Sequence, residues 1–400
     1  MRPEKRPSAA RRRGEADVRE KPSPASTRVE GARGLAPACY TSPDFHALEV
    51  ERIFRTQWLL LGRVDEVEQP GDYLSVDLLG EPLVMVRDAG GDVRVLSRIC
   101  RHRAMPVVSG AGHTRSFVCP YHTWTYALDG RLLGAPEMSQ TPHFDPGSCR
   151  LPSLRTEVWE GFLFVNFDAE APPLGPSLAS LARVVHNFDL AGMKTVRSVP
   201  FDMDCSWNWK LMCENFMEAY HHLGTHRKSL EPLMPARLSV TPDADGPFSV
   251  VHMRYRGGDG SADRDRWGAP LLPVNERVSE EERGRATLVH IFPTGLITLL
   301  PDHMEFYRLC PEGPTRIRLE KLICVSPEVR SRATFEAEMA QLIEGFVTIR
   351  DEDVAICRAV QQGLASRFAE PGRLCHLERP IGQFARYVEG RVRGTDATGR

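Results

Sequence analysis

Short apolar runs separated by turn residues dominate the chain between residues 70 and 170. The runs are rich in β-branched and aromatic residues, and glycine, proline and aspartate interrupt them. Many short strands with turn signals between them predict a small β-sandwich. An amphipathic helix is expected before them at 44–56, where apolar residues recur at helical spacing after the capping residue Ser42. The expected strands are 73–79, 83–87, 93–99, 117–119, 124–128 and 162–167.

The pattern changes to longer elements beyond a proline-rich segment at 171–176, which we predict to be a domain boundary. A helix is expected from about Trp207, and a long helix over 331–367 shows apolar residues at helical spacing. A helix, antiparallel strands and a closing long helix indicate an α+β domain. A strand is expected before the first helix at 195–203, and the strands expected between the two helices are 248–256, 288–300, 304–310 and 316–325.

Three parts are therefore expected: a disordered tail at 1–34, a first domain at 35–170 and a second at 171–400. The first 34 residues have almost no large apolar side chains, so they cannot bury enough surface to offset the entropy cost of ordering. The arginines at 11–13 could form a targeting or nucleic-acid patch. Acidic residues interspersed with them favour a solvated tail instead.

Composition suggests a cytoplasmic protein with no nucleic-acid or membrane partner. The 400 residues carry a formal net charge of −2, which gives no general attraction to nucleic acid or to anionic membranes. The longest apolar stretches fall short of the roughly 18 residues needed to span a bilayer. Ten cysteines, spread along the chain without dense pairing or a signal peptide, suit a reducing compartment.

Two cysteines and two histidines form the most specific motif in the chain. Cys100 and His102 spell C-x-H, and after sixteen intervening residues Cys119 and His122 spell C-x-x-H. This order suits a Rieske iron–sulfur centre, in which two histidines replace two cysteines on one of the two irons. A Cys2His2 zinc site uses the same four residue types. Zinc fingers, however, run a cysteine pair followed by a histidine pair, so the spacing favours the diiron cluster.

A second group of metal-type residues lies on the first helix of the second domain. Glu218 and His221 are three residues apart and would share a helix face, so the carboxylate could hold the imidazole. His226 could face the same metal only if the helix ended between the two histidines. Gly224 is the predicted terminator, because glycine takes a left-handed C-cap conformation cheaply. His221, His226 and a distant carboxylate would make the facial triad of a mononuclear iron(II) oxygenase.

Asp353 is the expected third ligand. It lies on the apolar stripe of the long C-terminal helix, and a buried carboxylate is costly unless it is paired or bound to a metal. The alternative is a structural ion pair with an arginine. Asp351 and Glu352 are weaker possibilities, because Asp351 shares its face with Arg358.

The residues around both motifs carry a resemblance to a known family. From about Tyr40 to Val392 the chain resembles the alpha subunits of Rieske-type aromatic ring-hydroxylating oxygenases. Ala104 and Thr123 depart from the family pattern, which most often has glycine there. The resemblance rests on Arg101, Arg103, Met105, Pro106, Pro120, Tyr121, Trp124, Tyr126, Asp129, Gly130, Asn208-Trp209-Lys210, Glu214-Asn215, Tyr220, Glu352-Asp353, Gln362-Gly363 and Ser366.

The resemblance implies a fold and a cofactor set. A Rieske [2Fe-2S] β-sandwich would precede a helix-grip domain, an antiparallel sheet with a long helix, holding mononuclear Fe(II). Electrons from NAD(P)H would arrive through a reductase, possibly with a ferredoxin, since the chain lacks a dinucleotide-binding G-x-G-x-x-G after a strand. Glu218 and Asn215 would be catalytic. The chain would form a homotrimer in which His122 of one subunit faces Glu218 and His221 of the next.

The same resemblance implies oxygenation of a small organic substrate with O2. Hydroxylation, oxidative demethylation and N-oxygenation share their first steps. Glu218 stands where ring dioxygenases usually have aspartate, which points toward the branch acting on quaternary amines and other non-aromatic substrates. A Rieske electron-transfer protein without oxygenase activity is the alternative. It would have no need for the histidine pair at 221 and 226.

Overall fold

The computed structural model describes residues 32–201, 203–257 and 270–394. Most of the tail expected at 1–34 therefore lies outside the described residues. Its last residues pair with the C-terminal region, because Gly34 N donates to Gly372 O at 3.0 Å and Leu374 N donates to Ala32 O at 3.0 Å. Three short helices follow, and the Ser42 side chain caps the second by accepting from Phe45 N. They are α1 (Ala38–Thr41), α2 (Pro43–Glu49) and the π-helical η1 (Val50–Phe54).

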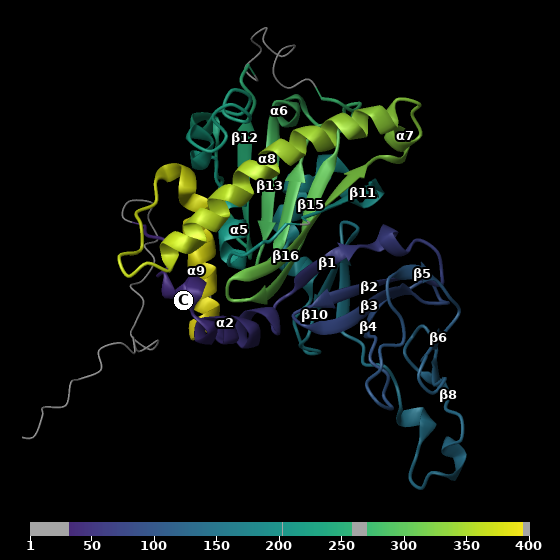
Figure 1. The fold of residues 1–400 in the computed structure, drawn as a ribbon. Helices are drawn as coiled ribbons and strands as arrows, with labels where there is room; N and C mark the ends of the chain where they lie inside the picture. The colour runs from purple at the N-terminus through teal and green to yellow at the C-terminus, as the bar shows by residue number, and fades with distance from the viewer. Residues whose placement is uncertain (1–31, 202, 258–269, 395–400) are drawn as a thin grey trace, which may run out of the picture.

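The N-terminal domain is built from three small antiparallel sheets, which confirms the predicted β-sandwich (Figure 1). The strand orders are β4-β3-β2-β5, β6-β7-β8 and β1-β10-β9. Every expected strand is present, but β1, β5, β8 and β9 were not anticipated. β1 is a fully buried apolar run, whose periodicity does not separate strand from helix, and β5 and β8 are only three residues long. The bounds are β1 (Leu59–Arg63), β2 (Asp72–Leu78), β3 (Glu81–Arg87), β4 (Val93–Ser97), β5 (Ala111–His113), β6 (Phe117–Val118), β7 (Thr125–Tyr126), β8 (Leu132–Gly134), β9 (Arg155–Trp159) and β10 (Phe162–Asn166).

The C-terminal domain is a six-stranded antiparallel sheet crossed by the long helix α8 (Phe335–Leu364), as the α+β prediction required (Figure 1). The single strand expected at 288–300 is wrong, because the chain turns at Pro293, which cannot donate to a sheet ladder. The strand order is β11-β16-β15-β14-β13-β12. The strands are β11 (Lys194–Pro200), β12 (Phe248–Arg254), β13 (Arg285–Ile291), β14 (Gly295–Leu299), β15 (Met304–Gly313) and β16 (Arg316–Val325).

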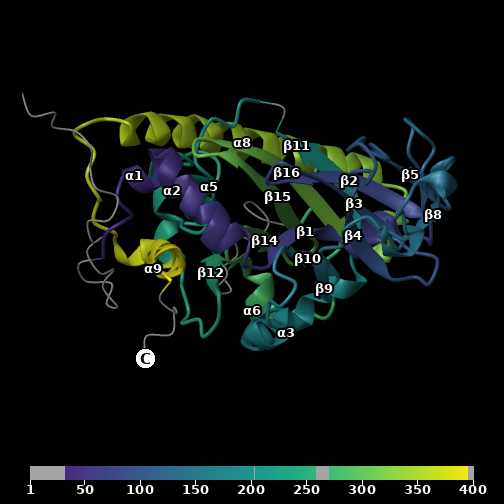
Figure 2. The ribbon, with the colours of Figure 1, turned by 90° about the horizontal axis from the view of Figure 1, so that it is seen from below.

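The remaining helices lie around this sheet, and none of the helices in the described ranges is long and apolar enough to cross a membrane. α9 was not anticipated from the sequence, although it packs beside α5 and η1 (Figure 2). Its buried apolar residues Ile381, Phe384, Ala385 and Val388 do recur at helical spacing, so the sequence pattern could have revealed it. These helices are α3 (Leu174–Ser177), α4 (Ala179–Val185), α5 (Trp209–Phe216), α6 (Glu280–Arg283), α7 (Pro327–Arg330) and α9 (Arg379–Arg393).

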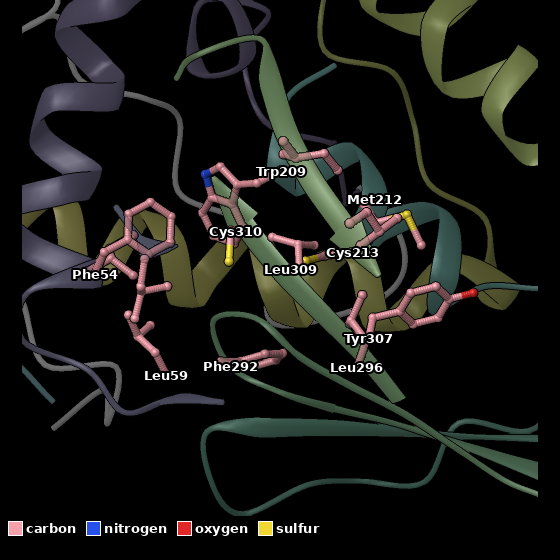
Figure 3. Close-up of a cluster of buried hydrophobic side chains, with 14 of the residues drawn as sticks. Phe54, Leu59, Trp209, Met212, Cys213, Phe292, Leu296, Tyr307, Leu309 and Cys310 are labelled. Atoms are coloured by element: carbon pink, nitrogen blue, oxygen red, sulfur yellow. The ribbon is translucent and has the colours of Figure 1, made fainter. Parts of the chain in front are cut away.

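One hydrophobic cluster joins the N-terminal helices, α5 and the large sheet (Figure 3). Trp209 at the start of α5 is fully buried between Phe54 and Phe384, with ring centroids 5.0 and 5.4 Å away. Edge-to-face contacts of this kind add to the stabilisation from burying aromatic surface. The cluster therefore fixes the position of α5, from which the second group of metal-type residues extends.

Candidate active site

The four residues of the first motif lie in two loops, one after β4 and one after β6. Cys100 and Cys119 are buried, whereas the His102 and His122 rings are more exposed and lie 4.6 Å apart between centroids. His102 also stacks on Trp124, with an interplanar angle of 7°. Both thiols thus face the interior and both imidazoles lie toward the surface.

The surroundings of these four residues fit an iron–sulfur cluster. The Tyr126 hydroxyl accepts a hydrogen bond from Arg101 N at 3.0 Å and lies 3.3 Å from Cys100 Sγ. Its own proton is therefore available to a thiolate at that position. Hydrogen-bond donors around the sulfur ligands tune the reduction potential of such clusters.

The two loops share a strained backbone turn. Ala104 N donates to Cys100 O at 3.1 Å and Thr123 N donates to Cys119 O at 2.9 Å. Ala104 and Thr123 both adopt the left-handed conformation, with φ of 56° and 57°. A side chain makes this conformation costly, which explains why glycine is the more usual residue at both places.

Replacing Ala104 by glycine is expected to stabilise the protein by about 1 kcal/mol, because glycine adopts positive φ without the steric cost. Thermal unfolding of the cluster-loaded protein would measure the effect. Ala127→Gly is the matched control: Ala127 directly follows β7 in the same domain and is not among the residues with positive φ, so the change should destabilise. Equal losses of stability from the two substitutions would contradict backbone strain at Ala104.

The second group of residues lies in the irregular segment that follows α5. The α5 helix begins after Asn208, whose side chain accepts from Lys210 N, and ends at Phe216. The prediction that Gly224 ends the helix in a left-handed conformation is wrong, because its φ is −109°. Glu218 already lies outside α5 and precedes a separate turn of 3-10 helix, Tyr220–Leu223.

Glu218 holds His221 by two contacts, although the two do not share a helix face as predicted. One carboxylate oxygen accepts from the His221 backbone N at 3.0 Å, and the other lies 2.5 Å from Nδ1 of the ring. The carboxylate therefore ties both the backbone and the ring of this histidine. It leaves the opposite ring nitrogen, Nε2, directed toward α8.

His221, His226 and Asp353 converge on one point. One ligand atom from each lies within 4.8 Å of the other two. Asp353 Oδ1 is 2.9 Å from His226 Nε2 and 3.7 Å from His221 Nε2. Two imidazoles and one carboxylate are the donor set of mononuclear iron(II) oxygenase sites, so the residues present fit the metal that the sequence suggested.

Further side chains orient these donors. Asn215 Nδ2 donates to Asp353 Oδ1 at 2.9 Å. Glu352, which the sequence left as a weaker ligand, lies 2.7 Å from Nδ1 of His226 instead, and the Ser229 hydroxyl donates to it at 2.6 Å. Nothing in the sequence identified Ser229. Such outer contacts fix the tautomer and direction of a metal-binding imidazole.

The electrostatics of Asp353 match a charged ligand. Burial alone would raise the pKa of this carboxyl, but hydrogen bonds from His226 and Asn215 and the nearby histidines hold its pKa below the usual value. Its polar side-chain contacts in the described chain are with histidines and Asn215, so the arginine ion pair considered as an alternative is not formed. Asp351 is exposed and pairs with Arg350.

A pocket of about 350 Å³ opens beside the three converging residues. Its lining is mainly apolar and comes from the α5 region, strands β12–β16 and α8. Phe216 belongs to this lining, whereas Met217 and Met304 are fully buried in hydrophobic clusters. The volume suits a small organic molecule.

The two groups of residues lie far apart in the chain's own fold. Figures 1 and 2 show the strands β6 to β8 at one end of the molecule and α5 in the opposite half. Both views agree on this separation. Within the described part of one chain, the first motif therefore does not contact the pocket.

Two protein-family models match the chain. The Rieske [2Fe-2S] domain model matches residues 57–145. The model of the ring hydroxylating alpha subunit, catalytic domain, matches residues 193–394, half of the chain. The first match contains all four residues of the first motif, and the second contains the three converging residues.

Similar proteins cover most of the chain. Choline monooxygenase of Beta vulgaris is 31% identical over 359 residues, which are 86% of this chain and 74% of that protein. The carnitine monooxygenase oxygenase subunit of Escherichia coli K12 is 25% identical and covers 82% of this chain and 83% of its own. The structure of naphthalene 1,2-dioxygenase from Rhodococcus sp. superposes with a TM-score of 0.77 at 21% identity, covering 92% and 95%.

Proposed function

Because the chain belongs to the Rieske non-heme iron oxygenases of the ring-hydroxylating alpha-subunit family, we propose specific ligands for the two metal centres of this enzyme. Members are oxygenases with a [2Fe-2S] cluster and a mononuclear iron, and a partner protein supplies their electrons. An electron carrier without oxygenase activity is therefore excluded. The proposed cluster ligands are Cys100, His102, Cys119 and His122, and the proposed iron ligands are His221, His226 and Asp353.

One observation carries the assignment of the iron site: three ligand atoms lie within 4.8 Å of one another at the edge of a substrate-sized pocket. When bound, the cluster would supply electrons and the iron would activate O2 for insertion into a small organic substrate. Glu218 and Glu352 would keep each Nδ1 occupied, so that both Nε2 atoms stay available. Asn215 would hold the Asp353 carboxylate in place through its 2.9 Å hydrogen bond.

We further propose a homotrimer in which one subunit's cluster serves its neighbour's iron. The separation of the two sites in Figures 1 and 2 supports this, because electron transfer within one chain would cross the molecule. His122 reaches toward the surface of its loop, and Tyr220 and Leu223, beside the proposed iron ligands, are 47% and 50% exposed. Glu218 would bridge His122 of one subunit and His221 of the next. Sedimentation of the purified protein as a monomer at working concentration would contradict the trimer.

The finer partner and location assignments are also proposals. A reductase, possibly with a ferredoxin, would draw electrons from NADH or NADPH. All ten cysteines are free of disulfide bonds, which supports the expected cytoplasmic location.

Replacing Glu218 by glutamine is expected to leave both metals bound and to slow electron transfer from cluster to iron by roughly 10–100-fold, the usual loss when an outer partner of a ligand is removed. Single-turnover oxidation of the reduced cluster by O2 measures the rate. Glu281→Gln, which changes a surface glutamate paired with Arg285, is the control. A single-turnover rate equal to that of the unmodified protein would refute the bridge.

Purified protein tests the proposed ligands as a whole. It should show the visible absorption and the reduced-state EPR signal of a Rieske centre, contain three irons per chain, and consume O2 with a surrogate reductase and substrate. Protein that contains zinc at the first motif and lacks both spectra would overturn the cluster assignment.

A further inference from the structure

Two buried charges line the pocket of the proposed active site. Lys321 on β16 and Glu305 on β15 are 5% and 8% exposed, and Lys321 Nζ lies 2.6 Å from Glu305 Oε2. The strand register pairs Lys321 with Tyr307, which places Glu305 diagonally across from the lysine on the same face of the sheet. Both charges and Tyr307 belong to the pocket lining, together with Asp353.

Each acidic residue of this lining, within the described part of the chain, already has a basic partner. Glu218 contacts His221 and Asp353 contacts His226. Asp302 Oδ1 is 2.7 Å from His303 Nδ1, and Glu305 lies between His303 and Lys321. A cationic substrate would therefore meet no unpaired carboxylate in the described lining.

Two of the phenylalanine and tyrosine rings that line the pocket, Phe346 and Tyr307, already face a cation. Lys321 Nζ lies 3.7 Å from the centre of the Phe346 ring and 5.5 Å from that of Tyr307. Aromatic faces at these distances are what recognises a quaternary ammonium group in protein sites. At Phe346 and Tyr307 such a group would have to sit next to a buried ammonium, which is unfavourable.

Lys321 retains donor capacity toward the pocket. An ammonium has three N–H donors, and one carboxylate contact, to Glu305, is described for it. The Tyr307 hydroxyl has no hydrogen-bond partner among the described residues. It points away from the hydrophobic cluster in Figure 3. Two donors beside a mainly apolar cavity suit an anionic oxygen on a mainly apolar molecule.

We propose that Lys321 is a specificity-determining residue and that the substrate carries a carboxylate on a largely apolar body. This inference rests on the proposed function, since it takes the pocket at His221, His226 and Asp353 to be the active site. The carboxylate would accept hydrogen bonds from Lys321 and the Tyr307 hydroxyl. The apolar body would lie among the remaining lining, which includes Phe216, Leu288 and Ile349.

Three ring compounds of similar size and different charge test the proposal by calorimetric binding to the metal-loaded protein. Benzoate should bind at least about tenfold more tightly than benzamide or phenyltrimethylammonium. Lys321→Met should weaken the binding of benzoate by about ten- to a hundredfold, which is the usual effect of losing a hydrogen bond to a charged group. The same change should alter the affinity for benzamide little. Lys194→Met, which removes a surface lysine paired with Glu68, should change neither.

Lys321→Met leaves the buried Glu305 carboxylate with His303 as its one basic partner, which could destabilise the fold. A second variant controls for this effect. Lys321→Met/Glu305→Gln removes both charges together and should also lose the preference for benzoate. Benzoate that still binds tightly to the double variant, or phenyltrimethylammonium that binds the unmodified protein best, would overturn the proposal. Protein that shows Lys321-dependent benzoate binding but holds no mononuclear iron would instead overturn the proposed function.

Discussion

Replacing His221 by alanine is expected to abolish turnover and to remove the mononuclear iron, while the visible absorption of the Rieske cluster stays intact. Nε2 of His221 is one of the three converging ligand atoms, and alanine offers no donor in its place. The loss should exceed the roughly 10–100-fold that follows removal of an outer partner. Iron content, cluster absorption and substrate-dependent O2 uptake of one preparation give the three readouts.

His222→Gln is the matched control for this change. The neighbouring His222 is buried, and its Nδ1 lies 3.1 Å from Met234 O, so its role is to pack and to hydrogen bond. Burial and the nearby His221 lower the pKa of His222 to about 4, which keeps the ring neutral. Glutamine can keep the contact with Met234 O, and the variant should retain iron. Loss of both iron and cluster absorption in His221→Ala would mean that the two centres are misassigned.

Asp353→Ala is expected to strip the mononuclear iron as completely as His221→Ala does. The carboxylate lies against both histidines, and Asn215 holds it in place. Two imidazoles alone leave the facial triad without its anionic ligand. Metal analysis after dialysis against a weak chelator measures the loss.

Asp351→Ala supplies the control on the same helix. Asp351 is exposed and paired with Arg350, so its removal should leave the iron in place and change stability by less than about 1 kcal/mol, as for other surface ion pairs. Iron that is lost from Asp351→Ala and kept in Asp353→Ala would move the third ligand to position 351.

The three neighbouring acids at 351–353 have three different surroundings. Asp351 points to solvent, Glu352 contacts His226, and Asp353 reaches the converging ligand atoms. Successive residues on a helix are about 100° apart, so the three side chains leave α8 in different directions. Sequence position alone could rank them only by the apolar residues around Asp353.

Much of the architecture follows from local pattern. The alternation of apolar runs and turn residues predicted the N-terminal sandwich, and the helical spacing over 331–367 predicted α8 at nearly its observed length, Phe335–Leu364. Burial on both faces accounts for two of the errors. The fully buried strand β1 has no alternation to reveal it, and the hairpin of β13 and β14 looked like one strand because both halves are buried.

The sequence by itself determined the donor types and their spacing, and through them the class of redox centre, because the choice of thiolates, imidazoles and carboxylates limits which metals can bind. It also singled out Glu218, His221, His226 and Asp353. Only the tertiary structure decided how these residues meet. Glu218 holds His221 from outside the helix that was expected to align them, and Glu352 orients His226 across more than a hundred residues of chain. The partners of Lys321 were equally hidden, since the pairing of strands that brings two buried charges together depends on register over the whole sheet.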